Sequence, residues 1–550
     1  MGFLFLLSLP VFSISFDSIN DTGDINALAL RLTNEMSDEQ ALAQTFMLGW
    51  VGAEPSPLIL DWIRNRNIGG VKIFGWNTED TRKLAETVGN LQKNALASGF
   101  GIPLFVATDQ EGGLVRHVKG ATSETPGNMA IGASGRPMDA YLSGYYIGRE
   151  LALLGINMNF APSVDLYTNR DSTLIGPRSF GSDPVQAGIL GAAFAKGQKE
   201  MGVIATAKHY PGHGDTDLDS HGVLPKIDAS FELLWDRELL PYRLLAKEEL
   251  PAIMSGHLAF PNTQAGATPA SLSSWFLQDI LRDKIAYKGL VITDDLMMNG
   301  ATEFAGSLSR AAKQALLAGN DIIMLSKTPS LNDTVWTYLL SSMKDEPEFR
   351  ERVRDACRRI LLLKLEYLRG EKKVPYIPDL KKIDDGLVDP EGTAFFLGLA
   401  ARSVTLVNGR DVFPLSPERA GRVLLAGNFT DFFTYGRKAF PGAVSYWYDT
   451  TQVATEIVSY ARNVDTVIFC LSSKAGIRII QQLRGLNKRV IIFSVLSPAY
   501  LDDVSWADGA VAVYSYAPES FIAGFSAILG RIKAEGKLPF TLNTRSSSGN

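Results

Sequence analysis

Short apolar runs alternate with longer amphipathic segments from residue 24 to about residue 383. Eight of the apolar runs have the length of buried strands: residues 43–48, 70–75, 103–108, 156–162, 202–208, 252–256, 290–293 and 321–325. Segments between them carry apolar residues at helical spacing, among them residues 81–98, 137–154, 184–201 and 307–318. This alternation is typical of βα units around a parallel sheet. Eight such units predict a (β/α)8 TIM-type barrel over residues 24–373.

A different pattern follows residue 373. Residues 374–389 are rich in proline and aspartate, which predicts a linker. Beyond it, five apolar runs alternate with helical stretches such as residues 453–462; the runs are residues 403–406, 422–425, 466–470, 489–493 and 509–513. We therefore expect a smaller three-layer α/β sandwich domain over residues 390–550. All five histidines of the chain precede residue 258, so we expect the chemistry in the barrel.

Titratable side chains follow five of the predicted barrel strands. They are Asp109, Asp165, Lys208 with His209, His257 and Asp294. Each aspartate alone could be a helix N-cap. Because the carboxyl ends of all barrel strands meet at one mouth, five such strand ends together predict an active site there.

The densest group of titratable residues follows the fifth barrel strand. Residues 208–221 read KHYPGHGDTDLDSH and contain three of the five histidines and three aspartates. Glycine- and aspartate-rich segments are usually polar surface loops. A run that directly follows an apolar strand instead gathers proton donors and acceptors in one small volume, as acid–base catalysis requires.

This run resembles the signature K-H-F-P-G-H-G-D-T-x-x-D-S-H of glycoside hydrolase family 3, in its NagZ-like β-N-acetylhexosaminidase branch. Among the specified positions only Tyr210 differs, where the signature has phenylalanine. The resemblance implies that His221 is the general acid/base and that Asp219 is its partner. It also implies that Lys208 and His209 hold sugar hydroxyls.

The segment GLVITDDL, residues 289–296, supplies a carboxylate at the end of an apolar strand. Cleavage of a glycosidic bond with retention needs a nucleophile and an acid/base on opposite faces of the sugar. The resemblance identifies Asp294 as the nucleophile. Asp295 would face elsewhere, because neighbouring strand residues point in opposite directions, and we interpret it as a turn cap.

Two further segments match the family's sugar-binding positions. The resemblance implies that Asp109, in DQEGG, and Arg178, in IGPRSFG, bind the substrate. The chain departs from the family pattern eight residues after Asp109, where the usual arginine is replaced by His117 and Arg116 stands one position earlier. The sequence leaves open whether Arg116 or His117 makes the substrate contact of the missing arginine. His213 and His257 are equally compatible with the pocket and with structural roles.

These residues lead us to expect a retaining exo-β-N-acetylglucosaminidase that acts on terminal β-GlcNAc of peptidoglycan-type fragments. No cofactor and no metal is implied, because Gly212 and Gly214 favour a moving loop over a rigid ligand set. A β-glucosidase and a β-N-acetylglucosaminide phosphorylase stay alternatives, since an imidazole repels phosphate less than a carboxylate does. A non-catalytic carbohydrate-binding protein should lack the nucleophile or the acid/base, and both are present.

The composition narrows the possible partners. The 550 residues have a formal net charge of −5, which provides no electrostatic reason to bind nucleic acid. The two cysteines, Cys357 and Cys470, define neither a disulfide framework nor a zinc site. We expect a carbohydrate substrate, and the composition leaves the oligomeric state open.

The first 23 residues resemble a leader. Residues 3–16 are nearly all apolar, and the polar residues 17–24 follow. The apolar run has the length of a signal-peptide core and is too short to span a bilayer. No lysine or arginine precedes it. We expect an exported bacterial protein, periplasmic or extracellular, without a membrane span, or a cytoplasmic one if this segment is not a functional signal.

Overall fold

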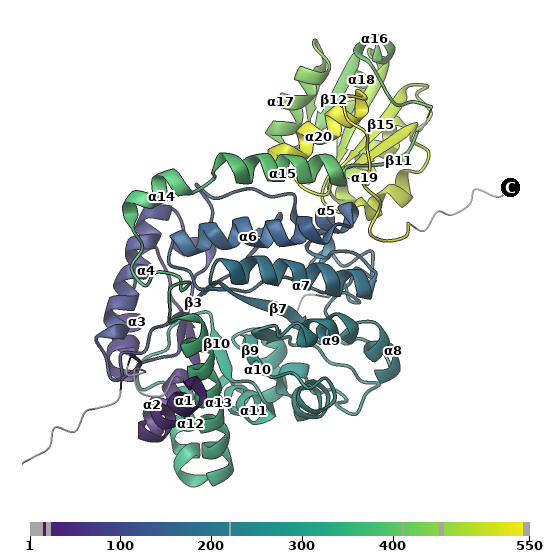
Figure 1. Cartoon of the computed structure of the whole chain (residues 1–550). Helices are drawn as coiled ribbons and strands as arrows, with labels where there is room; N and C mark the ends of the chain where they lie inside the picture. Colours follow the sequence, from purple (N-terminus) through teal and green to yellow (C-terminus); the bar gives the residue numbers. More distant parts are fainter. Residues whose placement is uncertain (1–14, 18–23, 219–221, 410, 450–455, 543–550) are drawn as a thin grey trace, which may run out of the picture.

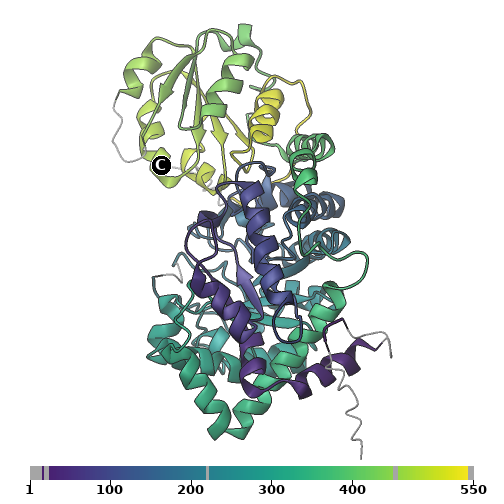
Figure 2. The ribbon, with the colours of Figure 1, turned by 90° about the vertical axis from the view of Figure 1, so that its left-hand side faces the viewer.

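The computed structural model describes residues 15–17, 24–218, 222–409, 411–449 and 456–542. A barrel occupies the lower part of Figure 1, and a smaller sheet-containing domain lies beyond the ends of α6 and α7 at the upper right. Figure 2 shows the same two parts from the side, with the smaller domain above the barrel. We call residues 390–542 the second domain.

The barrel has eight parallel strands in a closed ring, so the predicted (β/α)8 barrel is confirmed. Its members are β1 (Phe46–Gly49), β2 (Gly70–Lys72), β3 (Phe105–Thr108), β6 (Met158–Asn159), β7 (Ile204–Tyr210), β8 (Ala252–Ser255), β9 (Leu290–Asp295) and β10 (Ile322–Leu325). Each observed strand overlaps one of the predicted apolar runs. The ring closes between β1 and β2, where Met47 is paired with Gly70.

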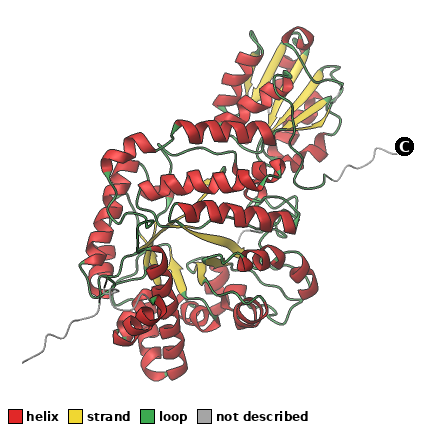
Figure 3. Ribbon diagram, in the orientation of Figure 1, coloured by secondary structure: helices red, strands yellow, loops and turns green. Residues whose placement is uncertain are grey.

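Helices surround the strands, as the red ribbons around the yellow arrows in Figure 3 show. They include α1 (Ile25–Glu35), α2 (Asp38–Gln44), α3 (Pro57–Asp61), α4 (Thr81–Leu96), α5 (Gly127–Ser134), α6 (Pro137–Leu153), α7 (Pro184–Glu200), α8 (Phe231–Asp236), α9 (Leu239–Lys247), α10 (Asn299–Ala305), α11 (Leu308–Ala318), α12 (Thr334–Asp345) and α13 (Pro347–Tyr367), together with the π-helices η2 (Trp62–Arg66) and η6 (Trp275–Lys284). Their starts follow local chemistry. Asp183 accepts hydrogen bonds from two backbone amides of α7, and Ser37 forms a capping box with Gln40.

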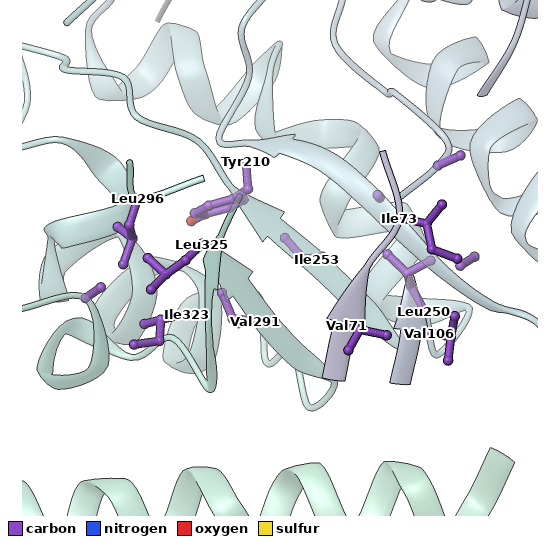
Figure 4. Packing of buried hydrophobic residues seen from close by; sticks show 14 of the residues in the cluster. Val71, Ile73, Val106, Tyr210, Leu250, Ile253, Val291, Leu296, Ile323 and Leu325 are labelled. Atoms are coloured by element: carbon purple, nitrogen blue, oxygen red, sulfur yellow. The ribbon is translucent and has the colours of Figure 1, made fainter. Parts of the chain in front are cut away.

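Side chains alternate along each strand between the barrel interior and the layer under the helices. Phe105 and Ala107 of β3 belong to the interior cluster, whereas Val106 between them packs in the outer layer. Figure 4 shows that outer layer, with Val71, Val106, Ile253, Val291 and Ile323 among its members. The two-residue period of a strand produces this division, and it leaves the strand ends free for polar side chains.

The second domain is built on a six-stranded sheet in the order β11-β16-β15-β14-β12-β13. Its strands are β11 (Thr405–Asn408), β12 (Val423–Gly427), β13 (Val444–Trp447), β14 (Thr466–Leu471), β15 (Arg489–Ser494) and β16 (Gly509–Ala512). Its helices are α15 (Pro390–Ser403), α16 (Pro417–Ala420), α17 (Thr430–Ala439), α18 (Ile457–Arg462), α19 (Lys474–Ile480) and α20 (Pro518–Ile528). One apolar cluster lies on each face of the sheet. The domain therefore has three layers.

Two features of this region differ from the sequence expectations. The edge strand β13 was not predicted, because its residues Val444 and Trp447 are exposed and form no continuous apolar run. The expected linker, residues 374–389, contains the helix α14 (Leu380–Gly386), whose N-cap Asp379 accepts a hydrogen bond from Lys381 N.

Most of the predicted leader lies outside the described residues. Phe16 is described; it is buried at the barrel floor, and its amide donates to Phe100 O at 2.9 Å. Within the described parts of the chain, the helices include none with the length and apolar character that crossing a membrane requires.

A buried lysine of the barrel floor makes stability depend on pH. Lys364 of α13 is fully buried, donates to Gln44 Oε1 at 3.0 Å, and lies 5.1 Å from the Phe105 ring centroid. Burial lowers the pKa of Lys364 to about 7. In the unfolded chain a lysine titrates near pH ~10.4, so between these values the unfolded chain binds the additional proton. The free energy of unfolding must therefore rise with pH in this window.

We expect Lys364→Met to be more stable than the wild type near pH 7 and to lose this advantage as the pH approaches 10. A pKa shift of this size changes the free energy of unfolding near pH 7 by an amount on the order of 4 kcal/mol. The gain should be smaller, because Gln44 Oε1 loses its donor. Urea unfolding of both proteins at pH 6.5, 8 and 9.5 measures the difference. A difference that does not change with pH would contradict the assignment.

Candidate active site

The predicted strand ends meet at the carboxyl-terminal mouth of the barrel. Asp109 directly follows β3, Lys208 and His209 lie in the last part of β7, and Asp294 lies in the last part of β9. The charges of His209 and Lys208 both act on the Asp294 carboxylate. The fold thus brings together side chains that are up to 185 positions apart in the sequence.

Asp109 is held between two ammonium groups. Its carboxylate forms ion pairs with Lys72 Nζ at 2.7 Å and with Lys208 Nζ. Burial alone would raise the pKa of Asp109, but the charges of Lys208 and Lys72 outweigh it and hold this pKa well below its usual range. Asp109 is therefore an anion at the barrel mouth that can accept hydrogen bonds. Lys72 was not predicted; its only signal was a charged residue within an apolar strand.

Arg178 is fixed by a second buried carboxylate. Its Nε and Nη2 donate to Glu111 Oε2 and Oε1 at 3.0 and 2.7 Å, and Lys208 Nζ lies 2.7 Å from Glu111 Oε1. Burial would lower the pKa of Arg178, but Glu111 raises it above its ordinary value. This bidentate geometry holds the guanidinium in one orientation. Glu111 was quoted within the DQEGG segment but was not identified as a site residue.

Asp165 orients His209. Its Oδ2 lies 2.6 Å from His209 Nδ1, and its Oδ1 accepts the backbone N–H of His213 at 2.7 Å. Burial would raise the pKa of Asp165, but His209 and His213 lower it. Because the carboxylate accepts, Nδ1 of His209 carries a proton. His209 Nε2 then lies 3.5 Å from Arg178 Nη2.

His213 is buried beside His209. It is 2% exposed, and its ring packs edge-on against His209 at 5.7 Å. Burial, followed by the charge of His209, lowers the pKa of His213 to about 4. It therefore supports the architecture of the loop as a neutral imidazole at physiological pH.

Asp294 has the charge state that a nucleophile needs. Burial would raise its pKa, but His209 and His257 lower it below the ordinary value. Its Oδ1 accepts the backbone N–H of Asp295 at 2.8 Å. The Asp295 carboxylate turns away and accepts from Met297 N at 3.0 Å and Ser326 N at 3.1 Å, so it caps the turn after β9.

His257 supports the chain just beyond Asp294. Its Nε2 lies 3.0 Å from Asp295 O, and its Nδ1 lies 2.7 Å from Ser271 Oγ. A carbonyl oxygen only accepts, so Nε2 carries the proton. Burial lowers the pKa of His257, which leaves Nδ1 as acceptor from the Ser271 hydroxyl. His257 is fully buried and has a positioning role.

The structure places His117, and not Arg116, beside Asp109. Arg116 donates to Thr122 O at 2.8 Å and to Glu124 at 2.8 Å, away from Asp109. His117 Nδ1 instead lies 3.5 Å from Asp109 Oδ2 and 3.3 Å from Lys72 Nζ. Burial, followed by the Lys72 charge, lowers the pKa of His117 to about 4. A neutral imidazole thus stands beside Asp109, where the family pattern has arginine.

Asp219 and His221 lie outside the described residues, so their assignment as acid/base dyad stays a prediction from sequence. The described part of their loop ends at Leu218. Within it, Asp215 is paired with Arg237 Nη2 at 2.5 Å, and Thr216 Oγ1 accepts from Leu218 N at 3.1 Å.

Removal of the Lys72 charge should weaken substrate binding. In Lys72→Met, Asp109 keeps Lys208 but loses half of its cationic support, so we expect the KM to rise roughly 10- to 100-fold with a smaller change in kcat. The pKa of Asp109 should also rise, which moves the acidic limb of kcat/KM to higher pH. Steady-state kinetics from pH 4 to 8 measures both effects. Lys364→Met, which removes a buried lysine at the floor of the barrel, serves as control, and an equal effect there would contradict the interpretation.

Three comparisons relate the chain to known proteins. Residues 41–363 match the family profile described as the glycosyl hydrolase family 3 N-terminal domain. The chain is 36% identical over 282 residues to a β-hexosaminidase of Tolumonas auensis, a match that covers 50% of the chain and 81% of that relative. It is also 36% identical over 285 residues to β-hexosaminidase A of Pseudoalteromonas piscicida. This match covers 49% of the chain and 47% of that relative.

Among solved structures, a glycoside hydrolase family 3 β-N-acetylglucosaminidase from Paenibacillus sp. superposes with a TM-score of 0.84 at 28% identity. This match covers 92% of the chain and 99% of that structure, so it includes the second domain as well as the barrel. The resemblance inferred from residues 208–221 is thereby confirmed.

Proposed function

Because the chain belongs to glycosyl hydrolase family 3, we propose that it is a retaining exo-β-N-acetylglucosaminidase. Its substrates would carry a terminal β-linked N-acetylglucosamine, as peptidoglycan fragments do. The observation that carries this proposal is the ionised, half-buried Asp294 at the end of β9, with Lys208 and His209 beside it. The names of the similar β-hexosaminidases support the amino sugar.

In the first half of the reaction, an Asp294 carboxylate oxygen attacks the anomeric carbon. The bond from this carbon to the leaving oxygen breaks, and His221 supplies the proton that this oxygen needs. The result is a covalent glycosyl–enzyme. In the second half, His221 removes a proton from water, whose oxygen displaces Asp294 and releases the sugar with retained configuration. Asp219 stabilises the imidazolium of the first half.

The described residues supply the binding that makes this attack efficient. Asp109 is an acceptor whose low pKa keeps it anionic, while Lys208 and Arg178 are donors that cannot turn away, because Glu111 holds both. Groups whose geometry is set before the substrate arrives cost no reorganisation during the reaction. The sugar can therefore be held by its hydroxyls with its anomeric carbon toward Asp294.

The assay that tests the proposal compares 4-nitrophenyl β-GlcNAc with 4-nitrophenyl β-glucoside. We expect a kcat/KM at least tenfold higher for the amino sugar. A clear preference for the glucoside would overturn the amino-sugar assignment. Formation of GlcNAc 1-phosphate in phosphate buffer would indicate phosphorolysis, and binding of GlcNAc without any turnover would indicate a binding protein.

A further inference from the structure

The loop from Asp165 to Arg178 carries an active-site residue at each end. It connects β6 with the 3₁₀ helix η4 (Gly176–Arg178). At its start, Asp165 orients His209, and at its end, Arg178 is clamped by Glu111. Any displacement of this loop therefore moves Arg178 and, through Asp165, also disturbs the orientation of His209. We call it the Asp165–Arg178 loop.

The middle of this loop is attached to the second domain by polar contacts. Arg170 donates to Asp502 at 3.3 Å and to Asp503 at 2.6 Å, both in the 3₁₀ helix η8 (Pro498–Val504). Lys474 of α19 donates to Asp171 at 3.1 Å. These pairs join the loop to two separate elements of the second domain.

Tyr167 adds a buried connection. Its hydroxyl lies 2.7 Å from Arg170 O and 2.9 Å from Ser497 Oγ, and its ring packs edge-on against Phe540 at 4.8 Å. Burial raises the pKa of Tyr167 to about 12, so the hydroxyl keeps its single proton. A carbonyl only accepts, so this proton is donated to Arg170 O, and Ser497 donates to Tyr167. The resulting chain of hydrogen bonds has one fixed direction.

The apolar surroundings of Tyr167 come from both domains. The ring belongs to a buried cluster with Met129, Ala130 and Ala133 of α5 and with Ala499, Ala512 and Tyr514 of the second domain. Tyr167 is 4% exposed. The loop is thus anchored by packing as well as by polar contacts.

The opposite side of the loop contacts the segment after β7 that contains His213 and Gly214. Asn169 N donates to Gly214 O at 3.3 Å. A Cβ atom at Gly214 would lie only 1.5 Å from Leu166 O, so the two backbones are in direct contact. The Asp165–Arg178 loop therefore lies between the second domain and the segment that begins with Lys208 and His209.

We propose that the second domain acts on catalysis through this loop, with Tyr167 and Arg170 as positioning residues. They hold the loop so that Arg178 and the Asp165–His209 pair face the bound sugar. This inference rests on the proposed function and assigns the second domain a role in substrate binding.

The test compares Tyr167→Phe and Arg170→Ala with a matched control. Tyr167→Phe removes the hydroxyl and keeps the ring. Arg402→Ala, the control, removes another ion pair between the domains: Arg402 of α15 donates to Asp139 of α6 at 2.6 Å. The exposed fractions of the side chains match, with 29% and 5% for Arg402 and Asp139 and 32% and 8% for Arg170 and Asp502.

For each variant, KM, kcat and the melting temperature are measured with whichever of the two nitrophenyl glycosides the wild type hydrolyses. Failure of the amino-sugar assignment therefore leaves this test intact. We expect Tyr167→Phe and Arg170→Ala to raise KM about tenfold or more with kcat within threefold, and Arg170→Lys to recover part of the loss. Arg402→Ala should lower the melting temperature as much as Arg170→Ala and leave KM unchanged. Wild-type KM in both loop variants, or an equal KM change in Arg402→Ala, would overturn the inference.

Discussion

Replacement of Asp294 with alanine should abolish turnover of every β-GlcNAc substrate, with kcat reduced by roughly four to six orders of magnitude. Without this carboxylate the glycosyl–enzyme cannot form, and the acid/base has no intermediate to resolve. The loss should not depend on the leaving group. It is measured as the rate of nitrophenol release, with the near-UV circular dichroism spectrum as evidence of native folding.

Asp295→Ala is the matched control for this experiment. Asp295 is the adjacent carboxylate, but it accepts from Met297 N and Ser326 N and thus caps a turn. Its loss should cost stability on the order of 1 kcal/mol and much less activity than the loss of Asp294. If both variants lost activity equally, Asp294 would not be the nucleophile.

The second large effect concerns His221, and here the loss should depend on the substrate. His221→Ala should be severely impaired with a sugar leaving group, which needs a proton, and much less impaired with a nitrophenolate, which leaves without one. We expect a difference between the two substrates of roughly 10²- to 10⁴-fold. Deglycosylation then limits turnover, and azide should restore it by replacing the activated water. Product analysis with and without azide measures this.

Asp219→Ala should show a weaker form of the same pattern, since it removes the orientation of the imidazole but keeps the group itself. Equal losses in His221→Ala for good and poor leaving groups, without rescue by azide, would place the acid/base elsewhere. Asp217 would then be a better candidate than Asp215, because Asp215 is already paired with Arg237.

The barrel could be predicted because each of its strands is a separate apolar run. A strand that is buried on both faces forms a continuous apolar run, and eight such runs separated by helical segments predict the closed ring. The edge strand β13 escaped prediction for the opposite reason. With Val444 and Trp447 exposed, it is a strand only because β12 offers it a hydrogen-bonding edge.

Sequence alone was sufficient to find the residues with local signatures. Asp109, Lys208, His209 and Asp294 each end an apolar run, so their place at the mouth follows from the period of the fold. Lys72 and Glu111 could not be identified in this way. Each takes part in the site only because the fold places an opposite charge from another strand or loop beside it, and no spacing along the sequence predicts these ion pairs.

Arg116 and His117 show how far the site could be predicted from the sequence. The sequence determined that one of two neighbouring residues stands near Asp109. Neighbours in an extended segment point to opposite sides, and the pairing of Gln110 with Arg116 in the small β4–β5 hairpin (Gln110–Gly112 and Val115–Arg116) fixes which side each one takes.

The role of the second domain could not be predicted from sequence either, because its sequence contains no recognisable catalytic motif. Only the tertiary structure places Ser497 and Asp503 against the Asp165–Arg178 loop, because contacts across more than 300 positions arise from packing and leave no local pattern.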